Sequence, residues 1–184
     1  MLMAVFCLGA SLIGINAQEK DWANLQRYAQ QNAELPKPDK NEKRVVFMGN
    51  SITEGWVNTH PDFFKSNGYI GRGIGGQTSY QFLVRFREDV INLSPALVVI
   101  NAATNDIAEN TGAYHEDRTF GNIVSMVELA KANHIKVILT TTLPAAAFGW
   151  NPSIKDAPQK IQSLNARIEA YAKANKIPFV NYYQ

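Results

Sequence analysis

Short apolar runs alternate along this chain with segments of helical periodicity, and this alternation restricts the fold more than any other feature. Residues 96–101 are almost entirely apolar, which is typical of a strand buried on both faces. Similar runs predict strands at 44–48, 69–74, 136–142 and 178–182, and helical spacing predicts helices at 79–92, 119–133 and 158–175. The alternation therefore predicts an α/β fold in which a parallel sheet carries helices on both faces, joined by right-handed crossovers.

The chain length fits one domain, preceded by a short leading segment. With 184 residues the chain can bury a sizeable core. Apolar positions in residues 21–35 recur at helical spacing and end at Pro36, which predicts one amphipathic helix. We therefore expect residues 18–43 to form a helix and a linker, and residues 44–184 to form the domain.

Residues 1–17 carry no charge, and residues 3–15 form an apolar stretch. This stretch is too short to span a bilayer and has the length of a signal-peptide core, although the usual basic start is missing. We expect a signal peptide and a secreted or periplasmic product, with a buried amino-terminal helix as the alternative. The single cysteine, Cys7, lies within the apolar stretch, so we expect neither a disulfide nor a stable membrane anchor.

Charge and histidine content exclude other classes of function. The chain has 18 basic and 16 acidic residues without a basic run, which argues against a nucleic-acid partner. Its three histidines, His60, His115 and His134, lack the spacing of zinc ligands. We predict no metal and no cofactor; the sequence leaves the oligomeric state open.

A serine follows the first predicted strand on a tight turn, Gly49-Asn50-Ser51. Gly49 allows a sharp change of direction, and ligands bind at the carboxyl ends of strands in open α/β sheets. A turn without chemistry is the alternative, because Gly, Asn and Ser all favour turns for local reasons. Ser51 is thus a candidate nucleophile that needs support from the rest of the chain.

Two later segments supply that support. Gly75-Gly76-Gln77-Thr78-Ser79 follows the second predicted strand, and Ala103-Thr104-Asn105-Asp106 follows the third. Together with the serine turn they resemble, in order, the first three sequence blocks of the GDSL or SGNH family of serine esterases and lipases. Asn50 stands where the family has aspartate, and Ala103 where it usually has glycine. The resemblance implies the SGNH hydrolase fold, a flavodoxin-like three-layer α/β/α sandwich with five parallel strands.

The same resemblance implies the roles of the site residues. Ser51 would be the nucleophile, and the oxyanion hole would consist of the Ser51 and Gly76 amides and the side-chain amide of Asn105. Gly49 and Asn50 would support the turn. Taken singly, the glycine pair could be a flexible turn and Asn105 a helix cap. Their occurrence at successive strand ends favours the oxyanion hole, and we expect Asp106 to cap the helix that follows it.

The base that activates the serine is the missing element. The family supplies histidine and aspartate from a late Asp-x-x-His block, and no such block occurs in these 184 residues. We therefore expect the sequence to be a fragment, incomplete at its carboxyl end. His115, flanked by Glu116 and Asp117, is the only conceivable substitute, although such clusters are more often solvated loops.

These features predict a secreted serine esterase that removes a short acyl group, above all acetyl, from a carbohydrate or another small ester. Phe148 and Trp150 lie in a loop after the fourth strand, where we expect them to be exposed and able to stack on sugar rings. Packing within the loop is an equal alternative for both aromatics. Two other functions stay open: a lysophospholipase or lipase, and a degenerate binding module that lacks the base.

Overall fold

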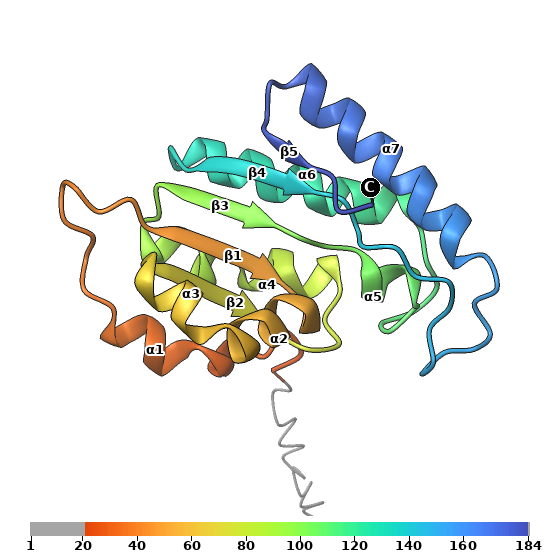
Figure 1. The fold of residues 1–184 in the computed structure, drawn as a ribbon, viewed down its shortest axis with the longest axis horizontal. Helices are drawn as coiled ribbons and strands as arrows, with labels where there is room; N and C mark the ends of the chain where they lie inside the picture. The colour runs from red at the N-terminus through yellow and green to blue at the C-terminus, as the bar shows by residue number, and fades with distance from the viewer. Residues whose placement is uncertain (1–20, 184) are drawn as a thin grey trace, which may run out of the picture.

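The computed structural model describes residues 21–183, so the expected signal peptide lies outside the described residues. Five parallel strands form one sheet in the order β2-β1-β3-β4-β5 (Figure 1). The strands are β1 (Val45–Gly49), β2 (Tyr69–Gly73), β3 (Leu97–Ile100), β4 (Lys136–Thr140) and β5 (Phe179–Val180). The expected α/β fold with a five-stranded parallel sheet is confirmed.

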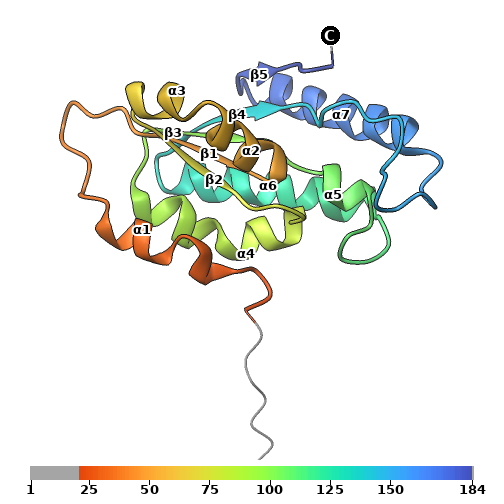
Figure 2. The same cartoon turned by 60° about the horizontal axis from the view of Figure 1, so that its bottom comes forward.

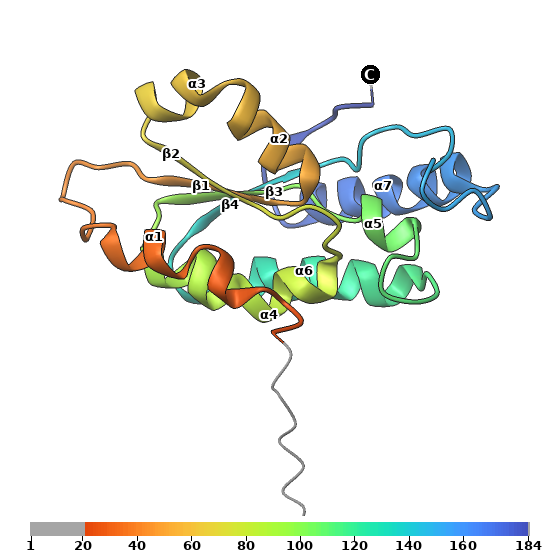
Figure 3. The ribbon, with the colours of Figure 1, turned by 90° about the horizontal axis from the view of Figure 1, so that it is seen from below.

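Helices cover both faces of the sheet, as predicted. On one face lie α2 (Ser51–Thr59) and α3 (Pro61–Ser66), which link β1 to β2. On the other lie α4 (Ser79–Asp89) and α6 (Glu116–Ala132), and α7 (Ala157–Ala174) packs against α6 and β4 (Figure 3). Shorter elements are η2 (Ile91–Leu93) and α5 (Thr104–Ile107). No helix within residues 21–183 is long and apolar enough to cross a membrane.

Alternate side chains of the strands divide the core into two parts. Val46, Met48, Val98, Ile100 and Leu139 are buried and belong to one cluster with the apolar faces of α4, α6 and α7. Phe47, between two of these positions, points to the other face. There it joins an aromatic cluster with Trp56, Phe63, Phe64 and Tyr69, whose neighbouring rings have centroids 5.3 to 5.6 Å apart.

The segment before the domain is not the single helix that we expected from residues 21–35. It forms a 3-10 turn, η1 (Leu25–Arg27), and a short helix, α1 (Ala29–Glu34), which runs beside α4 (Figure 2). Asn24 precedes η1 with φ 54°, outside the helical region, and the Asp21 carboxylate accepts hydrogen bonds from Leu25 N and Gln26 N. Tyr28, between the two elements, donates its hydroxyl to the Gly73 carbonyl. Anchoring to the sheet therefore outweighs helical periodicity here.

The fifth strand is shorter than predicted, with only Phe179 and Val180 paired to β4. Beyond it, Tyr182 N donates to Thr141 Oγ1 at 2.8 Å. The chain thus still follows the β4 edge, and Tyr182 lies near the carboxyl ends of the strands.

Candidate active site

The serine turn has the predicted geometry at the end of β1. Ser51 is exposed at the first position of α2, whereas Asn50 is fully buried. Asn50 Oδ1 accepts a hydrogen bond from Ile52 N at 3.0 Å and so caps the helix. A Cβ atom on Gly49 would lie only 2.0 Å from Thr53 Oγ1, so the turn requires glycine. This hydrogen bond is consistent with the expected support of the turn by Asn50, which stays a prediction.

The glycine loop after β2 reaches the serine. A Cβ atom placed on Gly75 would lie 3.8 Å from Ser51 Cβ. Gly76 has φ +76°, in the left-handed region that favours glycine. Within residues 21–183 the Gly76 amide hydrogen forms no hydrogen bond, so it is available to a ligand.

The third segment is joined to the second by Asn105, on α5. Asn105 is 3% exposed, and its Nδ2 donates to the Gln77 carbonyl at 2.9 Å. A primary amide carries two hydrogens, so the second remains for a ligand. The preceding Ala103 is buried with φ 84°, a backbone conformation that explains why the family usually has glycine at this position. All three segments therefore meet at the carboxyl edge of the sheet.

Asp106 does not cap the helix that follows it, contrary to our expectation. It lies within α5, and its carboxylate accepts hydrogen bonds from Ser79 N at 2.9 Å, from Ser79 Oγ and from Thr119 Oγ1 at 3.2 Å. Burial raises the pKa of Asp106, against the opposing effect of these hydrogen bonds. Asp106 thus ties the start of α4 to α6 beneath the site.

A buried arginine that we did not predict supports the same loops. Arg85 is 0% exposed and donates to the Gly49 carbonyl at 3.0 Å and to Gln77 Oε1 at 2.6 Å. Asp89, one helical turn later, pairs with it at 2.8 Å. Burial lowers the pKa of Arg85. The sequence signal was an Arg and an Asp four residues apart on a helix face that also carries Phe82 and Phe86.

None of the three histidines is hydrogen-bonded to Ser51 within the described part of the chain. His60 follows α2 and contacts Thr59 Oγ1 through Nδ1 at 2.9 Å. His115 precedes α6 and lines a separate cavity of about 240 Å³ that also contains Asp106 and Thr119. His134 lies beyond the other end of α6. The structure therefore gives no support to His115 as a substitute base.

The two aromatic residues in the loop after β4, Phe148 and Trp150, differ in their exposure to solvent. Phe148 is 1% exposed and packs in the core, so the expectation that it is exposed is wrong. Trp150 is 62% exposed, and its Nε1 donates to Asn110 Oδ1 at 2.9 Å. Asn110 Nδ2 in turn donates to the Gly76 carbonyl at 3.0 Å. Of the two aromatics, Trp150 is thus the exposed one, linked through Asn110 to Gly76, and the buried Phe148 ring packs against it with ring centroids 5.3 Å apart.

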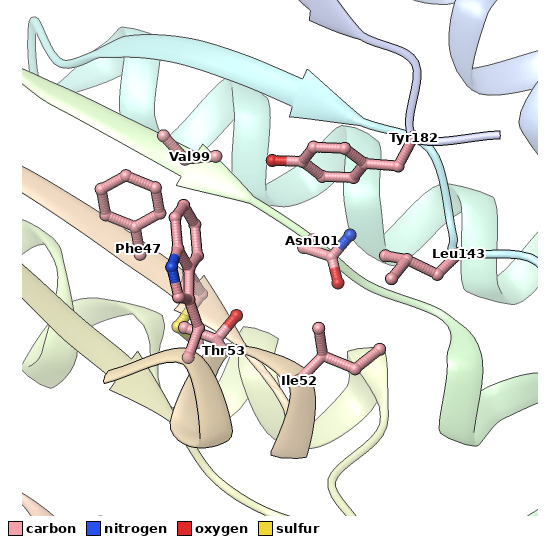
Figure 4. Close-up of a pocket in the computed structure, with 9 residues that line it drawn as sticks. Phe47, Ile52, Thr53, Val99, Asn101, Leu143 and Tyr182 are labelled. Carbon is pink, nitrogen blue, oxygen red and sulfur yellow. The ribbon is translucent and has the colours of Figure 1, made fainter. Parts of the chain in front are cut away.

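A mainly apolar pocket of about 390 Å³ lies beside α2, the helix that begins with Ser51. Its floor comes from β1 and β3, and its rim includes Ile52, Leu143 and Tyr182 (Figure 4). Asn101, at the end of β3, borders it and donates Nδ2 to Thr140 Oγ1 at 2.7 Å. The pocket thus lies on the α2 face of the sheet, next to the serine turn.

A parallel sheet with a serine, a glycine amide and an asparagine amide at three successive strand ends defines a hydrolase-like α/β protein. Residues 47–184 match the model of the GDSL-like lipase/acylhydrolase family. The chain belongs to this family, as its sequence blocks indicated.

Solved structures agree with this assignment. The chain is 96% identical to a candidate acylhydrolase from Bacteroides fragilis NCTC 9343, with a TM-score of 0.89, over 90% of this chain and 79% of that one. It is 83% identical to a GDSL-like lipase from Bacteroides thetaiotaomicron VPI-5482, with a TM-score of 0.87, over 88% and 79% of the two chains. The acetyl xylan esterase AlAXEase shares the fold, with 24% identity and a TM-score of 0.62 over 76% and 77% of the chains.

Among curated proteins, the chain is 32% identical over 117 residues to the uncharacterized lipoprotein YqeF of Bacillus subtilis (strain 168). The match covers 54% of this chain and 48% of YqeF. The chain thus matches about half the length of this relative.

Proposed function

We propose that the protein is a serine esterase that removes a short acyl group, above all acetyl, from a carbohydrate or another small ester. The observation that carries the proposal is the convergence of Ser51, Gly76 and Asn105. A hydroxyl, a free backbone amide and a buried side-chain amide at one sheet edge are the nucleophile and oxyanion donors that acyl transfer requires.

In the proposed reaction Ser51 Oγ attacks the ester carbonyl carbon and loses its proton to a base. The carbonyl oxygen becomes negative and accepts hydrogen bonds from the Ser51 amide, the Gly76 amide and Asn105 Nδ2. Collapse of this intermediate breaks the bond to the alcohol, which leaves with a proton. Water then hydrolyses the acyl-enzyme, releases the carboxylic acid and restores Ser51.

The proposed substrate class depends on Trp150. Its exposed ring stands above the loop aromatic Phe148 and is joined through Asn110 to Gly76. A flat aromatic face held beside the reacting centre suits stacking against a sugar ring. Export to the periplasm or the outside of the cell, where acylated polysaccharides are met, fits the expected signal peptide.

Substrate comparison tests this proposal. Purified protein is assayed for acetate release from acetylated xylo-oligosaccharides and for hydrolysis of acetyl and palmitoyl nitrophenyl esters, with Ser51→Ala as the control. We expect acetyl esters to react faster and the control to be inactive. A preference for the long-chain ester or for lysophospholipid would instead support the lipase alternative.

One observation favours a second candidate, a binding module without catalysis. Ser51 has no histidine as a hydrogen-bond partner within residues 21–183. If the protein binds acetylated oligosaccharides yet releases no acetate, the pocket serves recognition rather than hydrolysis.

A further inference from the structure

The Gly75–Gly76 peptide is fixed on both sides by side chains from other elements. Gly75 N donates to Glu54 Oε2 at 2.9 Å, and the Gly76 carbonyl accepts from Asn110 Nδ2 at 3.0 Å. The next amide, Gln77 N, closes a turn onto the Ile74 carbonyl at 3.4 Å. The Gly76 amide is thus a free donor between two neighbours whose orientations are set.

Glu54 connects this loop to the nucleophile. It lies on α2, three residues after Ser51, so its position follows that of the serine. Its second oxygen, Oε1, accepts from Arg27 Nη2 at 2.9 Å. A Cβ atom on Gly75 would lie 3.1 Å from Glu54 Oε2, so a larger residue there would push the carboxylate away by a few tenths of an ångström.

Asn110 connects the loop to the third segment. Its backbone amide donates to the Asn105 carbonyl at 3.0 Å, and its side-chain oxygen accepts from Trp150 Nε1 at 2.9 Å. Both hydrogen bonds restrict the side chain that holds the Gly76 carbonyl. Glu54 therefore fixes the position of the Gly76 peptide relative to Ser51, and Asn110 fixes it relative to Asn105.

We infer that Glu54 and Asn110 are positioning residues that aim the Gly76 amide at the oxygen that becomes negative during acyl transfer. The inference rests on the proposed function, which it deepens. Neither side chain needs to touch the substrate. Arg27 offsets the charge of Glu54, which would otherwise oppose the developing oxyanion close by.

The expected signature is a change in turnover with little change in substrate binding, because the oxyanion charge exists only in the transition state. A displacement of about 1 Å in a catalytic group costs roughly 100-fold in rate. We therefore expect Glu54→Ala and Asn110→Ala to lower kcat by about 10- to 100-fold, with KM changed less than about twofold. Glu54→Gln keeps an acceptor for Gly75 N and should restore kcat to within about fivefold of wild type.

The experiment measures kcat and KM on nitrophenyl acetate, the rate of fluorophosphonate labelling and the thermal midpoint for each variant of the full-length protein. Glu169→Ala removes an exposed helical glutamate on α7 and is the matched control, with wild-type values expected. Labelling should slow in parallel with kcat, because the phosphonyl oxygen uses the same donors.

The outcomes distinguish the positioning role of Glu54 and Asn110 from the proposed esterase function. An unchanged kcat in Glu54→Ala and Asn110→Ala, or a rise in KM alone, overturns the positioning role while wild-type labelling keeps the proposed function. If Glu54→Ala does not fold, Glu54→Gln and Asn110→Ala decide in the same way. A wild type that neither hydrolyses the ester nor reacts with the probe overturns the proposed function, and the positioning role with it.

Discussion

Asn105 donates its side-chain amide to the Gln77 carbonyl at 2.9 Å, and this hydrogen bond joins the segment after β3 to the glycine loop after β2. Asn105→Ala removes both this bond and a proposed oxyanion donor. We expect a loss of about 1–3 kcal/mol in the free energy of unfolding, because a buried carbonyl loses its partner. Turnover should fall about 100- to 1000-fold, the usual effect of losing such a donor. Denaturant titration and steady-state kinetics measure the two effects.

Asn165→Ala is the matched control for this prediction. Asn165 is also buried, and its amide exchanges two hydrogen bonds with the Thr142 backbone, at 2.8 and 3.0 Å. We expect a similar loss of stability without loss of turnover. Full activity in Asn105→Ala, or equal inactivation by both variants, would refute the role of Asn105.

Gly76→Ala separates backbone strain from catalysis. Gly76 has φ +76° and Gly68 has φ +64°, and a Cβ atom at either position would meet at most Asn110 Nδ2 at 4.0 Å. Alanine should therefore cost about 1 kcal/mol of stability at both sites through strain alone. We expect only Gly76→Ala to lower kcat, by about 10-fold or more, because it shifts a proposed oxyanion donor. Equal kcat in the two variants would contradict the assignment.

Alanine substitution of the two aromatics in the loop after β4 should affect different properties, stability for Phe148 and substrate binding for Trp150. Phe148→Ala empties a fully buried site and should lower the free energy of unfolding by about 3–5 kcal/mol. Trp150 is exposed, so Trp150→Ala should cost about 1 kcal/mol or less. If the ring stacks on sugar, its loss should raise KM for acetylated oligosaccharides about 2- to 10-fold. An unchanged KM would remove Trp150 from the substrate site.

The buried carboxyl of Asp106 should impose a pH dependence on stability. Burial raises the pKa of Asp106 in the folded protein, so the folded state holds its proton more tightly than the unfolded state. The contribution of this group to the free energy of unfolding therefore falls as the pH rises above about 4, until the folded pKa is passed. Asp106→Asn lacks this dependence. The stability of wild type minus that of the variant should decrease with pH in denaturant titrations; an increase would contradict the pKa direction.

The fold followed from the sequence because its signals are local. Continuous apolar runs such as residues 96–101 and the helical spacing of residues 119–133 each identify one element, and alternation then requires a parallel sheet. The single helix that periodicity predicts over residues 21–35 does not form, and the Tyr28 hydroxyl instead bonds to Gly73, a contact between distant parts of the chain. The sequence likewise predicts an exposed Phe148, because the small residues beside it do not reveal the core into which it packs.

The location of the candidate site residues was predictable where they follow strand ends. Ser51, Gly76 and Asn105 could be placed on one edge because parallel strands end together. The side chains that hold these three residues in place could not be predicted from the sequence. Arg85, Glu54 and Asn110 act through hydrogen bonds to loops far away in sequence, and no periodicity or motif specifies those partners.

Ser51 is proposed as a nucleophile within an oxyanion hole, and its covalent labelling shows whether it reacts. The full-length protein is incubated with a fluorophosphonate, and its peptides are analysed by mass spectrometry. We expect one covalent adduct, on Ser51, that is absent from Ser51→Ala and slower to form in Asn105→Ala. A protein that stays unmodified at Ser51, or that is labelled equally in Ser51→Ala, would refute the proposed role of this serine.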